Sequence, residues 1–259
     1  MKERLRVGIL FGGQSLEHDV SITSALTIFE NIDQTRFEPI PIGIDKQGDW
    51  HFFQGQPFVT SARLQKRPSF KKDDPHFPII QPVKCYVGFF SPNQLRDIMD
   101  VAFPIIHGVN GEDGTLQGLL KLSQIPFVGS SMLSSAICMD KSIMKIILRE
   151  NGLITAKSLT LRSKESIDLK EITKEIQFPF FVKPANGGSS IGVSKVYSSD
   201  KALLSIEKAF EYDEKIIIEE YIDGREIECS VIGNLTPIAS LPGEVIPQHD
   251  FYTYKAKYF

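Results

Sequence analysis

A lysine beside a glycine-rich loop is the feature of this sequence most suited to chemistry on a phosphate. Lys183 ends the apolar run Phe180–Val182 and precedes the small-residue loop Gly187–Gly192. The lysine supplies a charge, and the N–H and hydroxyl groups of such a loop supply directed hydrogen bonds to phosphate oxygens. Because the lysine precedes the glycines, this is not a Walker loop. The alternative is a glycine-rich hairpin with a solvated lysine. Lys141, after Met139-Asp140, is either a second phosphate lysine or a surface residue at a helix start.

The segment His107–Gly118 combines a histidine with an unusual density of glycine, at positions 108, 111 and 114. His107 follows an apolar run that is typical of a parallel strand, and α/β proteins bind ligands at the carboxyl ends of such strands. These features favour a ligand-binding loop. The alternative is that Glu112 and Asp113 only cap the helix that follows, with His107 a polar loop residue.

A similar junction lies near the N-terminus, where an apolar strand ends at Gly12-Gly13 and a helix begins shortly after Glu17. Free backbone N–H groups and the positive end of a helix dipole meet at such a place. Glu17 is therefore either a ligand-facing carboxylate or a residue that merely favours the helix N-terminus.

Two further segments combine apolar or aromatic residues with charged ones. The run Ile216–Glu226 begins as an apolar strand and turns polar, so it could offer a backbone edge to an adenine and a carboxylate to a ribose. A plain strand with charged end residues is equally compatible with it. In Tyr252–Tyr258 aromatics and lysines alternate, which suits an exposed loop closing over a charged ligand or a disordered terminus.

The elements that must position these residues follow from hydrophobic periodicity. Strand, helix and strand patterns succeed one another at the N-terminus, which predicts a βαβ unit and a parallel sheet. Ile125–Val128 is expected to be a last short strand, and a serine-rich connection is expected from Gly129. The alternation of Ile227, Cys229 and Val231 predicts one further strand before a turn at Gly233-Asn234.

Length and composition limit the class of protein. At about 150 residues per domain, 259 residues suggest two domains with a third begun. A net charge of -3 excludes a polyanion binder driven by bulk charge. Three widely spaced cysteines, no apolar leader and no sufficiently apolar span indicate a cytoplasmic protein without a disulfide framework.

In this order the motifs resemble D-alanine–D-alanine ligases of the ATP-grasp superfamily. The resemblance extends from Gly12 to Tyr258 and is most specific in the His107–Gly118 block. It implies an α/β fold: an N-terminal parallel-sheet substrate-binding domain over residues 1–128, a central α+β ATP-grasp domain over 129–215, and an incomplete C-terminal ATP-grasp domain over 216–259. An insertion is expected at about 54–83.

The resemblance also implies roles for individual residues. Glu17 would hold the ammonium of the first D-alanine, which His107 would flank, and Lys257 would help receive the second substrate's carboxylate. Glu17, Ser189 and Tyr258 would form a hydrogen-bonded catalytic triad beside the reacting amine. The remaining implied residues would bind ATP: Lys141 and Lys183 at the phosphates, Gly188, Ser189 and Ser190 in the closing loop, Glu219, Tyr221 and Ile222 at the adenine, and Glu226 at the ribose.

The activity implied is ligation of two D-alanines through an acyl phosphate, for cell-wall peptidoglycan, by a homodimer that binds neither nucleic acid nor membrane. The cofactors implied are ATP and Mg²⁺ (or Mn²⁺), with metal ligands beyond Phe259, so residues 1–259 alone are expected to lack turnover. Two alternatives remain. One is a D-alanine–D-lactate ligase, which usually carries histidine near position 258, and the other is an inactive nucleotide- or D-alanine-binding fragment.

Overall fold

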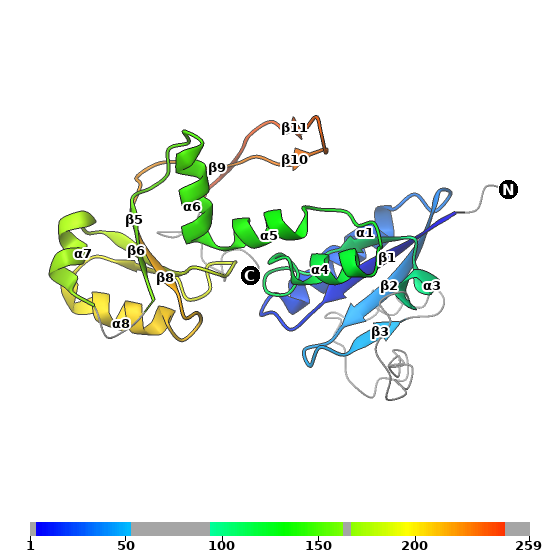
Figure 1. Cartoon of the computed structure of the whole chain (residues 1–259), viewed down its shortest axis with the longest axis horizontal. Coiled ribbons are helices and arrows are strands. Elements are labelled where there is room, and N and C mark those ends of the chain that lie inside the picture. Colours follow the sequence, from blue (N-terminus) through cyan, green and yellow to red (C-terminus); the bar gives the residue numbers. More distant parts are fainter. Residues whose placement is uncertain (1–3, 53–93, 163–166, 247–259) are drawn as a thin grey trace. The chain divides into compact units, whose positions relative to one another are not determined.

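The computed structural model describes residues 4–52, 94–162 and 167–246. The chain forms two compact units, Met1–Asp140 (unit 1) and Lys141–Phe259 (unit 2), and each contains its own four-stranded sheet (Figure 1). The predicted insertion at 54–83 and the Tyr252–Tyr258 segment lie outside the described residues. The predicted division into three domains stays a prediction.

The sheet of unit 1 has the strand order β3-β2-β1-β4. The central strand β1 pairs in parallel with both β2 and β4, and β3 is an antiparallel arm on the edge of β2. The strands are β1 (Leu5–Gly12), β2 (Phe37–Ile44), β3 (Trp50–Phe52) and β4 (Val101–Pro104). The predicted parallel sheet is therefore confirmed, and the loops after β1 and β4 leave the sheet at the same edge.

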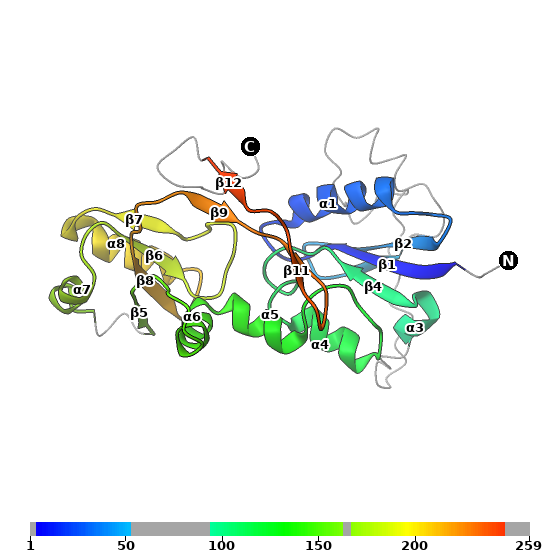
Figure 2. The same ribbon diagram turned by 90° about the horizontal axis from the view of Figure 1, so that it is seen from above.

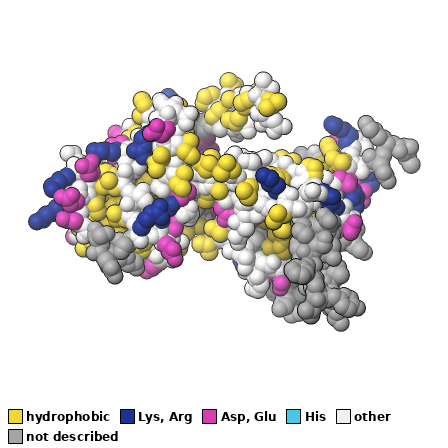
Figure 3. All heavy atoms as spheres, in the orientation of Figure 1, with side chains coloured by type: hydrophobic (Ala, Val, Ile, Leu, Met, Phe, Trp, Pro, Cys, Tyr) yellow, Lys and Arg dark blue, Asp and Glu magenta, His cyan; other side chains and the backbone are white. Residues whose placement is uncertain are grey.

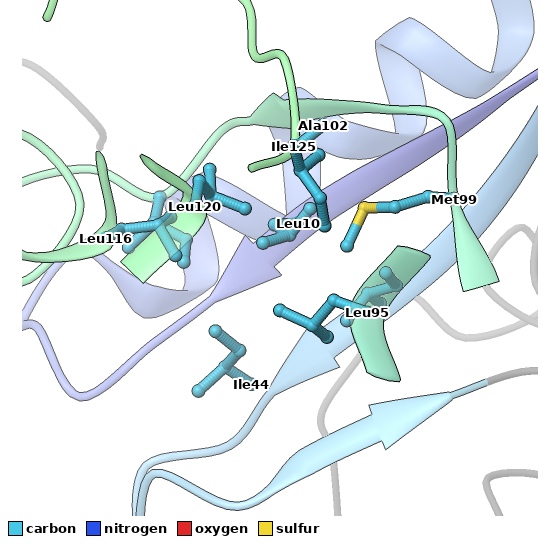
Figure 4. Packing of buried hydrophobic residues seen from close by; sticks show 10 residues of the cluster. Leu10, Ile44, Leu95, Met99, Ala102, Leu116, Leu120 and Ile125 are labelled. Atoms are coloured by element: carbon cyan, nitrogen blue, oxygen red, sulfur yellow. The ribbon is translucent and has the colours of Figure 1, made fainter. Parts of the chain in front are cut away.

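Helices cover both faces of this sheet because β1 buries its side chains in alternation (Figure 2). Ile9 and Phe11 pack against Ile22 and Phe29 of α1 on one face. Leu10 lies in a second cluster on the other face, formed with residues of β2, β4, α3 and α4 (Figure 4). The described helices of unit 1 are α1 (His18–Asn31), α3 (Gln94–Ile98), α4 (Thr115–Leu122) and α5 (Met132–Met139).

Two local predictions in unit 1 were wrong. The expected strand at Ile125–Val128 forms a single parallel bridge, between Phe127 and Ala102. The expected serine-rich connection contains the helix α5, whose N-cap Ser131 accepts a hydrogen bond from the backbone N–H of Ser134. A serine that caps a helix is hard to distinguish by composition from one in a loop.

The sheet of unit 2 is antiparallel and has the order β5-β8-β6-β7. Its strands are β5 (Ser158–Leu161), β6 (Phe180–Pro184), β7 (Ser194–Val196) and β8 (Ile216–Glu220). Phe180, Val182, Ile216 and Ile218 bury one face against α7 (Leu169–Glu175) and α8 (Ser199–Ala209). The residues between them on β6 and β8 point to the opposite face of this sheet.

The last described segment of unit 2 consists of two short antiparallel pairs, β9 (Glu226–Glu228) with β12 (Gly243–Val245) and β10 (Val231–Ile232) with β11 (Ile238–Ala239). The single strand predicted across 227–231 is thus divided into β9 and β10. The hairpin predicted at Gly233-Asn234 is confirmed, although its loop spans 233–237. Hydrophobic side chains gather on this exposed hairpin (Figure 3).

The longest of the described helices, α1, has 14 residues, and none of the described helices has both the length and the apolar character needed to cross a membrane.

Candidate functional site

The face of the unit 2 sheet opposite the core carries the phosphate-binding lysine predicted from the sequence. In the antiparallel register Phe181 lies opposite Glu219, and Lys183 lies opposite Ile217. Residues two apart on a strand share a face, so these four side chains project to the same side. Lys183 and Glu219 are diagonal neighbours there, and their ammonium and carboxylate form an ion pair.

A second lysine, which was not predicted from the sequence, binds the same carboxylate. Lys145 lies on α6 (Lys141–Glu150), and its ammonium contacts Oε1 of Glu219 while that of Lys183 contacts Oε2. The side chain of Lys145 is 8% exposed and that of Lys183 is 24% exposed. Burial raises the pKa of Glu219, but attraction to the two lysines outweighs it and holds the pKa below its ordinary value.

Lys141, one helical turn before Lys145, contacts the backbone that leads into the glycine-rich loop. Its Nζ donates a hydrogen bond to the carbonyl oxygen of Gly187 at 2.6 Å, and its backbone N–H donates to Ala185 at 3.0 Å. Ser189 and Ser190 have φ values of 49° and 59°, in the left-handed region. Consecutive residues with unusual backbone angles can turn their N–H groups toward one anion.

Lys141, Lys183 and the glycine-rich loop line a cavity of about 600 Å³ in unit 2. Its walls include apolar side chains and the loop, with charged groups at several points. Eight of the residues predicted to bind ATP line it: Lys141, Lys183, Gly188, Ser189, Ser190, Tyr221, Ile222 and Glu226. Glu219 is not among the lining residues but pairs with Lys183, which is. A volume of this size and a mixed lining suit a nucleotide-sized ligand.

The ring of Tyr221 is held by charged and aromatic neighbours. The ammonium of Lys195 lies 3.6 Å from its centroid, and the ring of Phe181 is inclined toward it at 6.2 Å. The Tyr221 hydroxyl donates to Asp223 at 3.2 Å. Cation–π contacts of this kind restrain an aromatic ring, so the strand end beside the cavity has a defined conformation.

In unit 1 the loops after β1 and β4 bring Glu17 next to the glycine motif. The side chain of Glu17 makes no capping hydrogen bond to α1, and the residue is buried at 6% exposure. A Cβ atom placed on Gly108 would lie 2.6 Å from Oε2 of Glu17. Gly108 also has a φ of 73°, which L side chains rarely adopt, so glycine at this position leaves room for the Glu17 carboxylate beside the loop.

His107 has polar neighbours at both ring nitrogens. Nε2 lies 3.1 Å from Oγ of Ser24, and Nδ1 lies 3.8 Å from Oε1 of Glu112. The other oxygen of Glu112 accepts a hydrogen bond from the N–H of Gly108 at 2.9 Å. Only Asp113 caps the helix, by accepting from the Thr115 N–H, so the capping alternative holds for Asp113 and not for Glu112.

The charge of His107 is set by these contacts. The contact with the Glu112 carboxylate raises the pKa of His107, burial opposes this, and the charge of Glu17 adds to the increase. Burial raises the pKa of Glu112, but the contact with His107 outweighs it and lowers that pKa overall. The pair therefore favours an imidazolium beside a carboxylate.

We expect Glu112→Gln to lower the pKa of His107, because the substitution removes the negative charge that stabilises the imidazolium. A group with a raised pKa stabilises the fold below its unfolded pKa, and this contribution is lost as pH rises through the folded value. An NMR titration of the His107 ring should show a lower midpoint in the variant. An unchanged midpoint would contradict the pairing, and Asp113→Asn serves as the control because Asp113 binds backbone N–H groups.

The predicted triad of Glu17, Ser189 and Tyr258 stays a prediction. Glu17 belongs to unit 1 and Ser189 to unit 2, and Tyr258 and Lys257 lie outside the described residues. Among residues 4–52, 94–162 and 167–246, no group of three or more His, Cys, Asp or Glu side chains is arranged to hold a metal ion.

The antiparallel sheet of unit 2, its glycine loop and its lysine-lined cavity define an ATP-grasp enzyme. Residues 6–130 match the family described as D-ala D-ala ligase N-terminus, and residues 147–259 match its C-terminus. The chain belongs to the D-alanine–D-alanine ligase family.

Relatives with similar sequences carry the same name. The chain is 46% identical over 256 residues to "D-alanine--D-alanine ligase" of Oceanobacillus iheyensis, covering 98% of this chain and 70% of the relative. It is 44% identical over 269 residues to "D-alanine--D-alanine ligase A" of Escherichia coli K12, covering 99% and 71%.

Solved structures of two ligases have a similar fold. VanG D-Ala:D-Ser ligase from Enterococcus faecalis matches with a TM-score of 0.81 at 34% identity, over 99% of this chain and 74% of that one. The D-alanine-D-alanine ligase from Coxiella burnetii matches with a TM-score of 0.76 at 33% identity, over 95% and 69%.

Proposed function

We propose that this protein is an ATP-dependent ligase that joins two D-alanine molecules into D-alanyl-D-alanine for peptidoglycan synthesis. The names of relatives 44–47% identical to the chain support this activity. The structural observation that carries the proposal is the unit 2 cavity, in which Lys141, Lys183 and the Gly187–Gly192 loop meet apolar walls.

The reaction requires a carboxylate to become an acyl donor. The carboxylate of one D-alanine attacks the γ-phosphate of ATP, which gives an acyl phosphate and ADP. The amine of the second D-alanine then attacks the carbonyl carbon, and phosphate leaves. Negative charge spreads over the transferring group, so lysines preorganised around it lower the barrier.

In this proposal the unit 2 residues hold the nucleotide. Lys141 and Lys183 contact the phosphates, and the loop with Gly188, Ser189 and Ser190 covers them through its N–H and hydroxyl groups. Tyr221 and Ile222 present backbone groups to the adenine, with Glu219 at the same edge, and Glu226 binds ribose hydroxyls. The family is expected to use magnesium, but the described residues contain no group of three or more His, Cys, Asp or Glu side chains arranged to hold a metal ion. We therefore assign no step to a metal ion.

The unit 1 residues hold the first amino acid. Glu17 offers a buried carboxylate to the ammonium of D-alanine, and the imidazolium of His107, stabilised by Glu112, offers a positive neighbour to its carboxylate. Ser189 and Tyr258 complete the triad with Glu17, and Lys257 receives the carboxylate of the second D-alanine. A homodimer located in the cytoplasm, without nucleic-acid or membrane partners, is part of the same proposal.

The test is D-alanine-dependent release of ADP by the full-length protein, with products identified by mass spectrometry. D-alanine alone should yield the dipeptide, and equimolar D-lactate or D-serine should leave it the main product at neutral pH. A main product containing lactate would instead support the depsipeptide alternative. Nucleotide binding without any D-alanine-dependent ADP release would support the binding-fragment alternative.

A further inference from the structure

Lys145 on α6 is a buried lysine to which the proposed function assigns no contact with the nucleotide. Lys145 is 8% exposed and does not line the cavity. Its Nζ pairs with Glu219 and also donates to the carbonyl oxygen of Ala156 at 3.1 Å. Burying an ammonium group is costly unless it is paired and hydrogen-bonded, so both contacts hold Lys145 in place.

Glu219 is shared by two lysines that differ in their freedom to move. Lys183 is 24% exposed, lines the cavity and contacts one carboxylate oxygen. Lys145 comes from a different element, α6, contacts the other oxygen and does not line the cavity. A phosphate group in the cavity would compete with Glu219 for Lys183, which lines the cavity, whereas Lys145 is buried and is not among the lining residues.

We propose that Lys145 is a positioning residue for nucleotide binding: it stays on Glu219 and keeps this carboxylate neutralised when Lys183 turns to a phosphate group. The inference rests on the proposed function. Without Lys145, Lys183 would be the counterion of a largely buried carboxylate, and its transfer to a phosphate would leave that charge unpaired. The net depression of the Glu219 pKa by both lysines agrees with this arrangement.

The place of Lys145 on the helix strengthens the argument. Lys141 and Lys145 are four residues apart on α6, so they share one face of the helix. Lys141 binds the carbonyl of Gly187 in the loop, and Lys145 binds Glu219 of β8. The same face of α6 therefore contacts both the loop proposed to cover the phosphates and β8, the strand that carries Glu219.

A double-mutant cycle separates this role from a purely structural one. ADP binding is measured by isothermal titration for the wild type, Lys145→Met, Glu219→Gln and the double variant. We expect Lys145→Met to weaken ADP binding about tenfold or more in the wild-type background. In the Glu219→Gln background no charge is left behind when Lys183 moves, so the same change should cost less than about twofold.

The controls keep the outcomes distinct. Lys174→Met removes a lysine that is 70% exposed and pairs with Glu171, and it should leave ADP binding unchanged. Thermal unfolding verifies that each variant is folded, and Lys145→Gln replaces the methionine variant if that variant does not fold. Equal losses in the two backgrounds, or no loss in either, would overturn the proposal. Failure of the proposed function is recognised separately, by a Lys183→Ala variant that binds ADP like the wild type.

Discussion

Replacing Lys183 by alanine is expected to lower the affinity for ATP, or the rate of phosphoryl transfer, by about 100-fold or more. A charge-assisted contact is worth roughly 3 kcal/mol, and each 1.4 kcal/mol or so is a factor of ten. Lys183 lines the cavity, and within the described part of the chain its counterion is Glu219, which retains Lys145 as a partner in the variant. The loss should therefore fall on the nucleotide and not on folding.

The measurement is the ratio kcat/KM for ATP at saturating D-alanine, together with the Kd for ADP. Lys174→Ala is the matched control because Lys174 lies on α7 of the same unit and is 70% exposed. Catalytic efficiency within about threefold of the wild type would remove Lys183 from the site, since such a change corresponds to well under 1 kcal/mol.

The second large effect is expected from Gly111→Ala in unit 1. A Cβ atom at this position would lie 2.2 Å from the carbonyl oxygen and 2.7 Å from the carbonyl carbon of Ile106. Backbone atoms cannot turn aside as a flexible side chain can, so the loop must shift. Gln117 also donates to the carbonyl of Gly111 at 2.7 Å, and that hydrogen bond would be strained as well.

We expect Gly111→Ala to lower the free energy of unfolding of unit 1 by about 3 kcal/mol or more, and the midpoint of its thermal transition by roughly 10 °C. Because Ile106 precedes His107, the KM for D-alanine should rise in the same variant. Gly118→Ala is the control: its added Cβ would meet only the Met132 side chain, at 3.3 Å, and alanine favours a helix. Equal stabilities for the two variants would contradict the packing of Gly111 on Ile106.

The strand and loop positions of the site were predictable because they depend on neighbours in the sequence. The apolar run before Lys183 and the glycines after it indicate a strand followed by a loop, and β6 ends at Pro184 as that pattern requires. The glycines of the His107–Gly118 block likewise indicated an unusual backbone, and Gly108 and Gly114 have φ values of 73° and 93°. A backbone conformation that favours glycine or ends a strand restricts the residue types at that position, so the sequence can indicate it.

The family resemblance was also present in the sequence, because the order of the motifs is retained along one chain. Matches to both family regions, at residues 6–130 and 147–259, confirmed it. The helix α5 was not predicted because the two serine pairs, Ser130-Ser131 and Ser134-Ser135, were interpreted as a connection between domains. What decides between the two is a hydrogen bond from the N–H of Ser134 to the side chain of Ser131.

The pairing of the charged side chains depends on contacts between segments that are distant in the sequence. Lys145 and Glu219 are 74 positions apart in the sequence, and Ser24 and His107 are 83 apart. No local pattern links such residues, because each contact joins a helix residue to a strand or loop that is distant in the sequence. Residue types and their spacing predicted which residues bind a phosphate or an amino acid, and these assignments stay predictions. The position of α6 beside the end of β8 gives Glu219 a buried counterion, Lys145, in addition to Lys183, among the residues that the structure describes.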